Sequence, residues 1–325
     1  GLFGNPNCGK STLFNALTGL RQKVGNFPGV TVDKKIGQLG LPNGETIRLI
    51  DFPGTYSFYP NSQDERIAVQ TLIDQDAEDY PDAILYVADV NHLEKHLLLF
   101  TQLYDLGLPT FLVLNMADQA EKNGLAVDVK QLQKSLNAPV FLLSARTGEG
   151  IEALKNSFVE IVQKQTKNTQ HFRQLSGAEK AISDKIQQQF PALNDYSALL
   201  YAHHYSWLPF LSIEQKAEIE TVVQGTKFES LKLQVNETME RFNKFTPITD
   251  SALASSQTDG NSQSLWLDNI LTHRIIGPVV FLAIMLLVFQ AIFAWASYPM
   301  DLIDNLFAAL SDGIEQLLPT GCVSD

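Results

Sequence analysis

Residues 4–11 read Gly4-Asn5-Pro6-Asn7-Cys8-Gly9-Lys10-Ser11 and fit the pattern G-x-x-x-x-G-K-S. This pattern is typical of a phosphate-binding loop between a strand and a helix, because its glycines let consecutive backbone N–H groups converge on phosphate oxygens. Lys10 is expected to contact the β- and γ-phosphates, and the Ser11 hydroxyl to bind Mg²⁺. Thr12 and the apolar residues after it continue at helical spacing. The sequence therefore predicts a nucleoside triphosphate site here.

Strand-like and helical patterns alternate from Gly1 to about Gln163. Two β-rich runs flank a Pro-Asn-Gly turn and predict a hairpin, and short apolar runs predict buried parallel strands. The expected strands are Lys35–Leu41, Glu45–Asp51, Ala83–Ala88, Thr110–Leu114 and Pro139–Leu143, and the expected helices are Glu94–Tyr104, Val129–Leu136 and Gly150–Val162. We therefore predict an α/β domain over residues 1–165, a doubly wound sheet of the P-loop GTPase type with ligands at the carboxyl ends of its strands.

Two further stretches predict contacts to Mg²⁺ and the γ-phosphate. Gly29-Val30-Thr31 lies in a Gly/Pro-rich segment before the hairpin, where the Thr31 hydroxyl is expected to bind Mg²⁺ and to order this loop only in the triphosphate state. Asp51 ends a predicted strand, and Gly54 follows it closely. We expect Asp51 to hold Mg²⁺ and the Gly54 N–H to meet the γ-phosphate. Lys10, Thr31 and Gly54 are thus predicted catalytic residues.

The last two stretches predict recognition of a guanine base. Asn115-Met116-Ala117-Asp118 follows an apolar strand, and the Asp118 carboxylate can accept both N–H groups of guanine's Watson–Crick edge, a donor pair that adenine lacks. Ser144-Ala145-Arg146 follows the last predicted strand and is expected to close over the base through backbone N–H groups. All five stretches occur in order, each at a strand end, so the sequence predicts a domain that binds GTP and GDP.

Composition and the two chain ends limit the function classes. The net charge of −12 argues against nucleic acid as a partner. Two cysteines, Cys8 and Cys322, are too few and too far apart for a disulfide framework, and Cys8 within the loop indicates the reducing cytosol. Because the chain lacks an initiator Met and ends soon after a long hydrophobic segment, we expect it to be a fragment of a longer membrane protein.

Three regions follow the α/β domain. Residues 166–245 read as a small all-helical domain with capping boxes at Ser176 and Ser212 and a last helix carrying apolar residues at 231, 235, 239 and 242. Residues 246–264 read as a flexible linker. Residues 265–325 begin a membrane domain, with a transmembrane helix at about 275–298 followed by an amphipathic helix. Arg274 before the apolar run and acidic residues after it favour a cytoplasmic N-terminal side.

The matching text Gly-Asn-Pro-Asn-Cys-Gly-Lys-Ser, Gly-Asn-Phe-Pro-Gly-Val-Thr, Asp-Phe-Pro-Gly-Thr-Tyr-Ser and Asn-Met-Ala-Asp resembles the FeoB-type ferrous iron transporters. This resemblance implies a cytosolic G domain and a helical GDI-like domain in front of a multi-pass transport domain in the bacterial inner membrane. It also implies Fe²⁺ uptake with slow GTP hydrolysis and a helical domain that strengthens GDP binding and relays the nucleotide state. Small accessory iron-transport proteins and homo-oligomers are candidate partners, while the oligomeric state and whether GTP powers or gates transport stay open. Fe²⁺ and other divalent ions stay open as substrates, as does a role for Cys322.

Three departures refine the expected mechanism. Thr55 stands where many small GTPases have a water-orienting glutamine, so hydrolysis should be slow. Potassium-activated GTPases use an asparagine at the position of Asn7, which is therefore a predicted K⁺ ligand and catalytic residue; its alternative role is to support the loop backbone. Met116 replaces a common lysine, which could weaken nucleotide affinity and speed GDP release. The alternative function is a membrane-tethered regulatory or assembly GTPase without transport activity.

Overall fold

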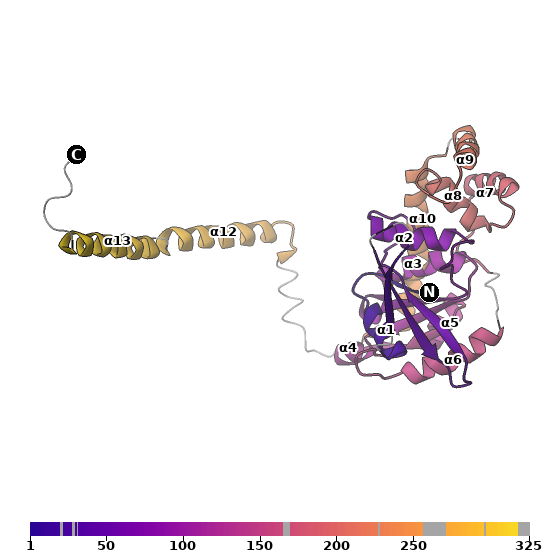
Figure 1. Ribbon diagram of the computed structural model, residues 1–325, viewed down its shortest axis with the longest axis horizontal. Helices are drawn as coiled ribbons and strands as arrows, with labels where there is room; N and C mark the ends of the chain where they lie inside the picture. Colours follow the sequence, from indigo (N-terminus) through magenta and orange to yellow (C-terminus); the bar gives the residue numbers. More distant parts are fainter. Residues whose placement is uncertain are drawn as a thin grey trace. The chain divides into compact units, whose positions relative to one another are not determined.

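The computed structural model describes residues 1–19, 22–27, 30, 32–164, 170–226, 228–255, 271–295 and 297–317. The chain forms two compact units, Gly1–Ser256 and Gln257–Asp325 (Figure 1). Gly29, Thr31 and Cys322, discussed above from the sequence, lie outside the described residues.

The first unit is built on a seven-stranded sheet of order β2-β3-β4-β1-β5-β6-β8. The strands β4, β1, β5, β6 and β8 run parallel to one another, while β2, β3 and β4 form an antiparallel meander. Their bounds are β1 Leu2–Gly4, β2 Gln22–Asn26, β3 Asp33–Gly40, β4 Thr46–Asp51, β5 Ile84–Asp89, β6 Thr110–Asn115 and β8 Val140–Leu142. All five predicted strands are confirmed to within two residues. The polar edge strand β2 was not predicted.

Helices cover both faces of this sheet, as the predicted α/β fold requires. They are α1 Lys10–Thr18, α2 Gln63–Ile73, α3 Leu93–Asp105, α4 Ala117–Lys122, α5 Val129–Leu136 and α6 Ile151–Lys164. Buried side chains of β5 and β6 form near-continuous apolar runs, which is the pattern of strands packed on both faces. Because β1 lies between β4 and β5, the loop after it opens at the carboxyl edge in the middle of the sheet.

The second half of this unit is helical. Its helices are α7 Gly177–Gln189, α8 Asp195–His204, α9 Ile213–Gly225 and α10 Ser230–Ala252, and α7, α8 and α9 gather at one end of the unit (Figure 1). Both predicted capping boxes are present, with Ser176 and Ser212 accepting the backbone N–H groups of Glu179 and Gln215. The predicted all-helical region is therefore confirmed in kind.

The predicted linker is wrong over its first ten residues. Helix α10 continues through Pro247 to Ala252, and β9 (Leu253–Ser255) then pairs antiparallel with β7 (Leu125–Val127). Phe245, Thr249 and Ala252 are buried at helical spacing, so contacts with the α/β domain hold this polar stretch in order. The rest of the predicted linker, residues 256–264, lies outside the described residues.

The buried face of α10 is only partly the apolar one. Of the four apolar residues expected in this helix, Leu231, Val235 and Met239 are exposed and Phe242 packs against the core, whereas Glu237 and Arg241 are completely buried. The buried charges belong to an ion-pair network, described below, which takes the place of an apolar contact. The spacing of apolar residues alone therefore does not identify the buried face of this helix.

The second unit contains two successive helices, α12 (Ile276–Trp295) and α13 (Ser297–Leu317). Among the described residues, α12 is the one helix long and apolar enough to cross a membrane, and the candidate span is Ile276–Phe293. Exposed apolar residues of α13 recur at helical spacing at positions 302, 303, 306, 307 and 310. Both features match the predicted apolar and amphipathic helices, with the boundary between them near Ser297.

Candidate functional site

The loop between β1 and α1 has backbone requirements that its sequence meets. Gly9 has a φ of 81°, and a Cβ at this position would lie 2.2 Å from Nδ2 of Asn115. A Cβ on Gly4 would lie 2.5 Å from the Val87 carbonyl oxygen. Asn7 has a φ of 66°, a left-handed conformation that asparagine adopts more readily than most residues. The glycines of the motif are thus needed for close packing as well as for loop shape.

The side chain of Asn5, a second asparagine of the loop, is held by two hydrogen bonds. Its Oδ1 accepts a hydrogen bond from the Tyr86 hydroxyl at 2.8 Å, and its Nδ2 donates to the Lys95 carbonyl at 3.2 Å. In contrast, the Asn7 side chain makes no hydrogen bond within the described part of the chain and points into solvent-accessible space. Its carboxamide oxygen is therefore available to a ligand.

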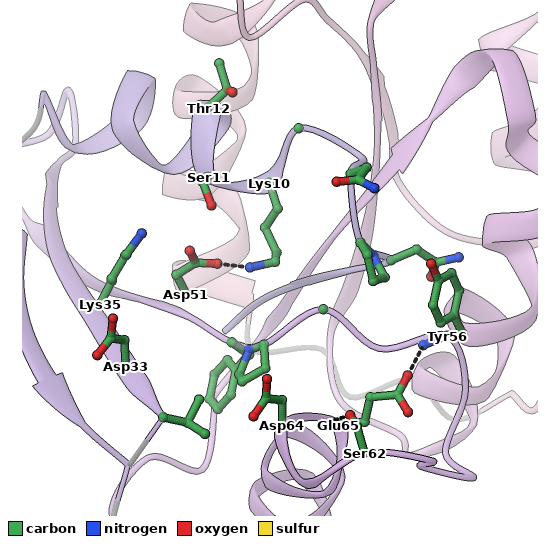
Figure 2. A pocket seen from close by; sticks show the side chains of 18 of the residues that line it. Lys10, Ser11, Thr12, Asp33, Lys35, Asp51, Tyr56, Ser62, Asp64 and Glu65 are labelled. Carbon is green, nitrogen blue, oxygen red and sulfur yellow. Dashed lines mark hydrogen bonds and ion pairs between the residues drawn. The ribbon is translucent and has the colours of Figure 1, made fainter. Parts of the chain in front are cut away.

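A cavity of about 1010 Å³ lies against this loop. It is lined by loop and α1 residues from Asn5 to Thr12, by the start of β3, by the end of β4 and by parts of the segment 51–65. Figure 2 shows Lys10, Ser11 and Asp51 converging on it from two elements. The cavity is thus located where the sequence predicts the phosphates.

Lys10 and Asp51 form an ion pair in this cavity (Figure 2). Their side chains are mostly buried, and the Ser11 hydroxyl lines the same cavity. One carboxylate and one hydroxyl oxygen beside a phosphate loop make the kind of oxygen donor set that Mg²⁺ takes together with phosphates and waters. The residues present therefore fit a Mg²⁺ ion.

The segment that carries Gly29-Val30-Thr31 is described only in part. Val30 is exposed, and its N–H donates to the Phe27 carbonyl at 3.3 Å. Phe27 is buried against Phe52, with ring centroids 5.5 Å apart, and its N–H donates to the Val32 carbonyl at 3.0 Å. The buried Phe27 thus anchors the base of this segment next to the strand end that carries Asp51.

Gly54 faces the cavity, whereas the side chain of Thr55 is buried. Gly54 lines the cavity and packs against Pro6 of the loop. Thr55 is buried, its N–H donates to the Gly4 carbonyl at 3.3 Å, and its hydroxyl donates to the Ser57 carbonyl at 3.0 Å. The Thr55 hydroxyl is therefore committed to the backbone and is not directed at the cavity.

The predicted base-recognition residues meet the loop at Gly9. Asn115 is buried at the end of β6, donates from Nδ2 to the Cys8 carbonyl at 3.0 Å, and accepts the Ala145 N–H on Oδ1 at 2.9 Å. One side chain thus joins three stretches that are far apart in sequence. Met116 follows with a φ of 67° and begins α4. The arrangement brings the phosphate loop and both predicted base loops together.

The Asp118 carboxylate is held by the loop after β8. Its Oδ1 accepts the Ser144 hydroxyl at 2.8 Å, and its Oδ2 pairs with the Arg146 guanidinium. The Ser144 hydrogen bond and the positive charge of Arg146 lower the pKa of Asp118. An ionised carboxylate is the form that can accept two N–H groups from a base.

A buried network, which sequence reasoning missed, connects the segment after Gly54 to the helical region. The Phe58 N–H donates to Gln102 Oε1 at 2.9 Å, and its carbonyl faces His204 Nε2 at 2.8 Å. The Tyr59 hydroxyl donates to Glu237, which also accepts from the Tyr196 hydroxyl at 2.8 Å. A Glu–Arg pair four residues apart within an otherwise amphipathic helix was the one sequence signal for it.

Arg241 is the only positive charge in the centre of this described network. Its Nε donates to Glu237 at 2.8 Å, and its guanidinium lies 2.8 Å from Asp105 of α3. Burial alone would raise the pKa of Glu237, but Arg241 and the two tyrosine hydroxyls hold it at about 2. Burial lowers the pKa of His204 to about 3, so this histidine is neutral.

His203 and His92 each have a partner within the described structure. His203 accepts or donates one hydrogen bond with Ser230 at 2.8 Å and packs on Phe228, and His92 pairs with Asp89. Within the described ranges, no group of three or more His, Cys, Asp or Glu side chains is arranged to hold a metal ion.

Comparisons with known proteins identify the family of this chain. The sequence profile of the family "Ferrous iron transport protein B" matches residues 1–158. The Fe(2+) transporter FeoB of Leptospira biflexa is 34% identical over 98% of this chain and 47% of its own length. The chain thus spans about half the length, or less, of the curated relatives that it matches.

Two solved structures cover the first unit. The cytosolic domain of L. pneumophila FeoB is 35% identical with a TM-score of 0.64, covering 78% of this chain and 98% of that one. The GMPPNP form of the T. maritima FeoB cytosolic domain is 35% identical with a TM-score of 0.60, with the same coverage. The chain therefore belongs to the FeoB family.

Proposed function

We propose that this chain binds and slowly hydrolyses GTP as the cytosolic part and first membrane helix of a bacterial inner-membrane Fe²⁺ uptake transporter. The observation that carries the nucleotide part is Asn115, which links the phosphate loop at Cys8 to the base loop at Ala145. The GMPPNP form of a relative supports a guanine nucleotide as the ligand. The FeoB family and the candidate span α12 support the transport part.

The residues predicted to contact the nucleotide have the following roles in this proposal. Lys10 leaves Asp51 to bind the β- and γ-phosphates, and backbone N–H groups of Gly4–Thr12 surround the phosphate oxygens. The Gly54 N–H contacts the γ-phosphate, and Asn115 and Asp118 hold the base. Ser11, Asp51 and Thr31 would hold Mg²⁺, which neutralises charge on the β- and γ-phosphates when bound.

The buried Thr55 supports slow hydrolysis. Its side chain is buried and does not line the cavity, and its hydroxyl proton is donated to the Ser57 carbonyl, so it is not placed to orient an attacking water. In the proposed mechanism, Asn7 and backbone carbonyls near residues 26–29 would hold a K⁺ ion, which would supply positive charge beside the phosphates when bound. An ion at that point supplies positive charge in the way that an arginine finger does.

We expect KCl to accelerate GTP hydrolysis over NaCl at equal ionic strength, and Asn7→Ala to remove that difference. The physical reason is that the free carboxamide oxygen of Asn7 is a suitable ligand for a weakly hydrated cation. Phosphate release measured in the two salts, for both proteins, checks this. Asn43→Ala, in the exposed turn between β3 and β4, serves as the control. Equal rates in both salts for the unmodified protein would contradict the K⁺ role.

The helical region is proposed to strengthen GDP binding and to relay the nucleotide state. Phe58 and Tyr59 follow Gly54 closely in the sequence. Both are bonded to the helical region, Phe58 to His204 and Tyr59 to Glu237. A movement of Gly54 toward a γ-phosphate would therefore pull on buried contacts in α8 and α10. We further propose that the domains divide near residue 165.

Uptake of ⁵⁵Fe²⁺ by the full-length protein in proteoliposomes tests the transport function. We expect uptake that depends on GTP and is lost in Lys10→Ala, which leaves the membrane part intact. Hydrolysis without any uptake would instead favour the alternative, a membrane-tethered regulatory or assembly GTPase. Competition by Mn²⁺ measures how selective the transport is for iron.

A further inference from the structure

Both oxygens of the Asp118 carboxylate are engaged by donors from the chain itself. The Ser144 hydroxyl donates to Oδ1 at 2.8 Å, and the Arg146 guanidinium binds Oδ2. Both donors come from the loop after β8, the same loop that is proposed to close over the base. In the proposed function, these two oxygens are the acceptors that guanine requires.

The chemistry of the two partners is closely similar. Guanine offers its N1–H and its 2-amino group, two N–H donors on one planar N–C–N unit. A guanidinium is also a planar N–C–N unit with parallel N–H donors, and it pairs with carboxylates in the same side-by-side geometry. In the structure one N–H of Arg146 donates to Oδ2, the oxygen that one of the two guanine N–H groups also needs.

We propose that Arg146 is an intramolecular competitor of the guanine base for Asp118. The guanidinium holds the carboxylate until an incoming nucleotide displaces it, and so it limits how fast and how tightly nucleotide binds. This inference rests on the proposed assignment of Asp118 to guanine recognition.

The Arg146 side chain can leave without any rearrangement of its loop. The Ala145 N–H is bound by Asn115, the Ser144 N–H donates to the Glu149 carbonyl at 3.0 Å, and the Gly148 N–H donates to the Ser144 carbonyl at 2.9 Å. The Arg146 side chain is 63% exposed, against 12% for Asp118. Displacing it therefore costs no more than an exposed ion pair, which corresponds to a factor of about two to five in affinity.

Arg146→Ala in the full chain, solubilised in detergent, tests the proposal. With a fluorescent GDP in a stopped-flow instrument, we expect the association rate constant to rise about two- to fivefold. The dissociation rate constant should not change, because competition is a property of the free protein. IDP, which lacks the 2-amino group, should gain the same factor as GDP. Raising the choline chloride concentration should shrink the difference between the two proteins.

Arg48→Ala is the matched control. Arg48 lies on another part of the sheet, in β4, and it is also half-exposed and paired with an aspartate, Asp79. This variant should leave both rate constants unchanged. An unchanged association rate in Arg146→Ala overturns the proposal, and so does faster dissociation, which would mean that Arg146 contacts the bound nucleotide. If Asp118→Asn leaves GTP affinity intact, the base assignment itself is wrong; a null result for Arg146→Ala alone removes only the competitor.

Discussion

Asp118→Asn should lose most of its affinity for GTP and gain affinity for xanthosine nucleotides. The substituted amide would direct an N–H donor at the donors of guanine, whereas the C2 carbonyl of xanthine accepts that N–H. Losing a bidentate, charge-assisted contact should cost on the order of 2–4 kcal/mol, or roughly 30- to 1000-fold in the dissociation constant. Titration of fluorescent GDP and XDP into both proteins measures the exchange.

Asp128→Asn is a suitable control for this experiment. Asp128 is an exposed aspartate that lies between the two base loops in the sequence. Its Oδ1 caps α5 by accepting the Gln131 N–H at 2.9 Å. Asparagine caps helices about as well as aspartate, so its nucleotide preference and stability should match the parent protein. Equal GDP affinity in Asp118→Asn and Asp128→Asn would remove Asp118 from base recognition.

The parts of the fold that local sequence determines were predictable. Gly9 needs a left-handed backbone, with a φ of 81°, and the buried strands β5 and β6 need uninterrupted apolar residues. Each of these requirements is met by a single residue or a short run, so a pattern along the chain expresses it. The site residues at strand ends followed from the same patterns, because parallel strands bring their carboxyl ends to one edge.

The parts that depend on distant contacts were not predictable in this way. Polar composition at residues 246–255 suggested a linker, yet Ala252 binds Asp128 through its carbonyl and β9 pairs with β7. Composition indicates how much conformational entropy a segment loses when it becomes ordered. It does not indicate which tertiary contacts offset that loss. Likewise, the burial of Glu237 and Arg241 depends on Tyr59 and Asp105, which lie far away in the sequence.

The buried face of α10 gives the second large effect that we expect. Arg241→Met should destabilise the Gly1–Ser256 unit by about 3–5 kcal/mol, because Glu237 and Asp105 would be left buried without a cation. Methionine keeps much of the side-chain volume, so the loss measures charge more than packing. Urea unfolding followed by circular dichroism gives the free energy. Arg66→Met, which removes an exposed arginine stacked 5.4 Å from Trp207, should cost less than about 1 kcal/mol.

The pH dependence of this loss separates charge from packing. In the parent protein the pKa of Glu237 is about 2, below its usual 4.5, so its stabilising effect is present above pH 4.5 and is lost as the pH falls toward 2. Without Arg241 the folded-state pKa should rise above 4.5, so the variant gains stability as it takes up a proton on acidification. The difference between the two proteins should therefore shrink from pH 7 to pH 4.5. Adding Glu237→Gln to Arg241→Met should recover part of the loss at pH 7, whereas a constant, pH-independent penalty would assign Arg241 a packing role only.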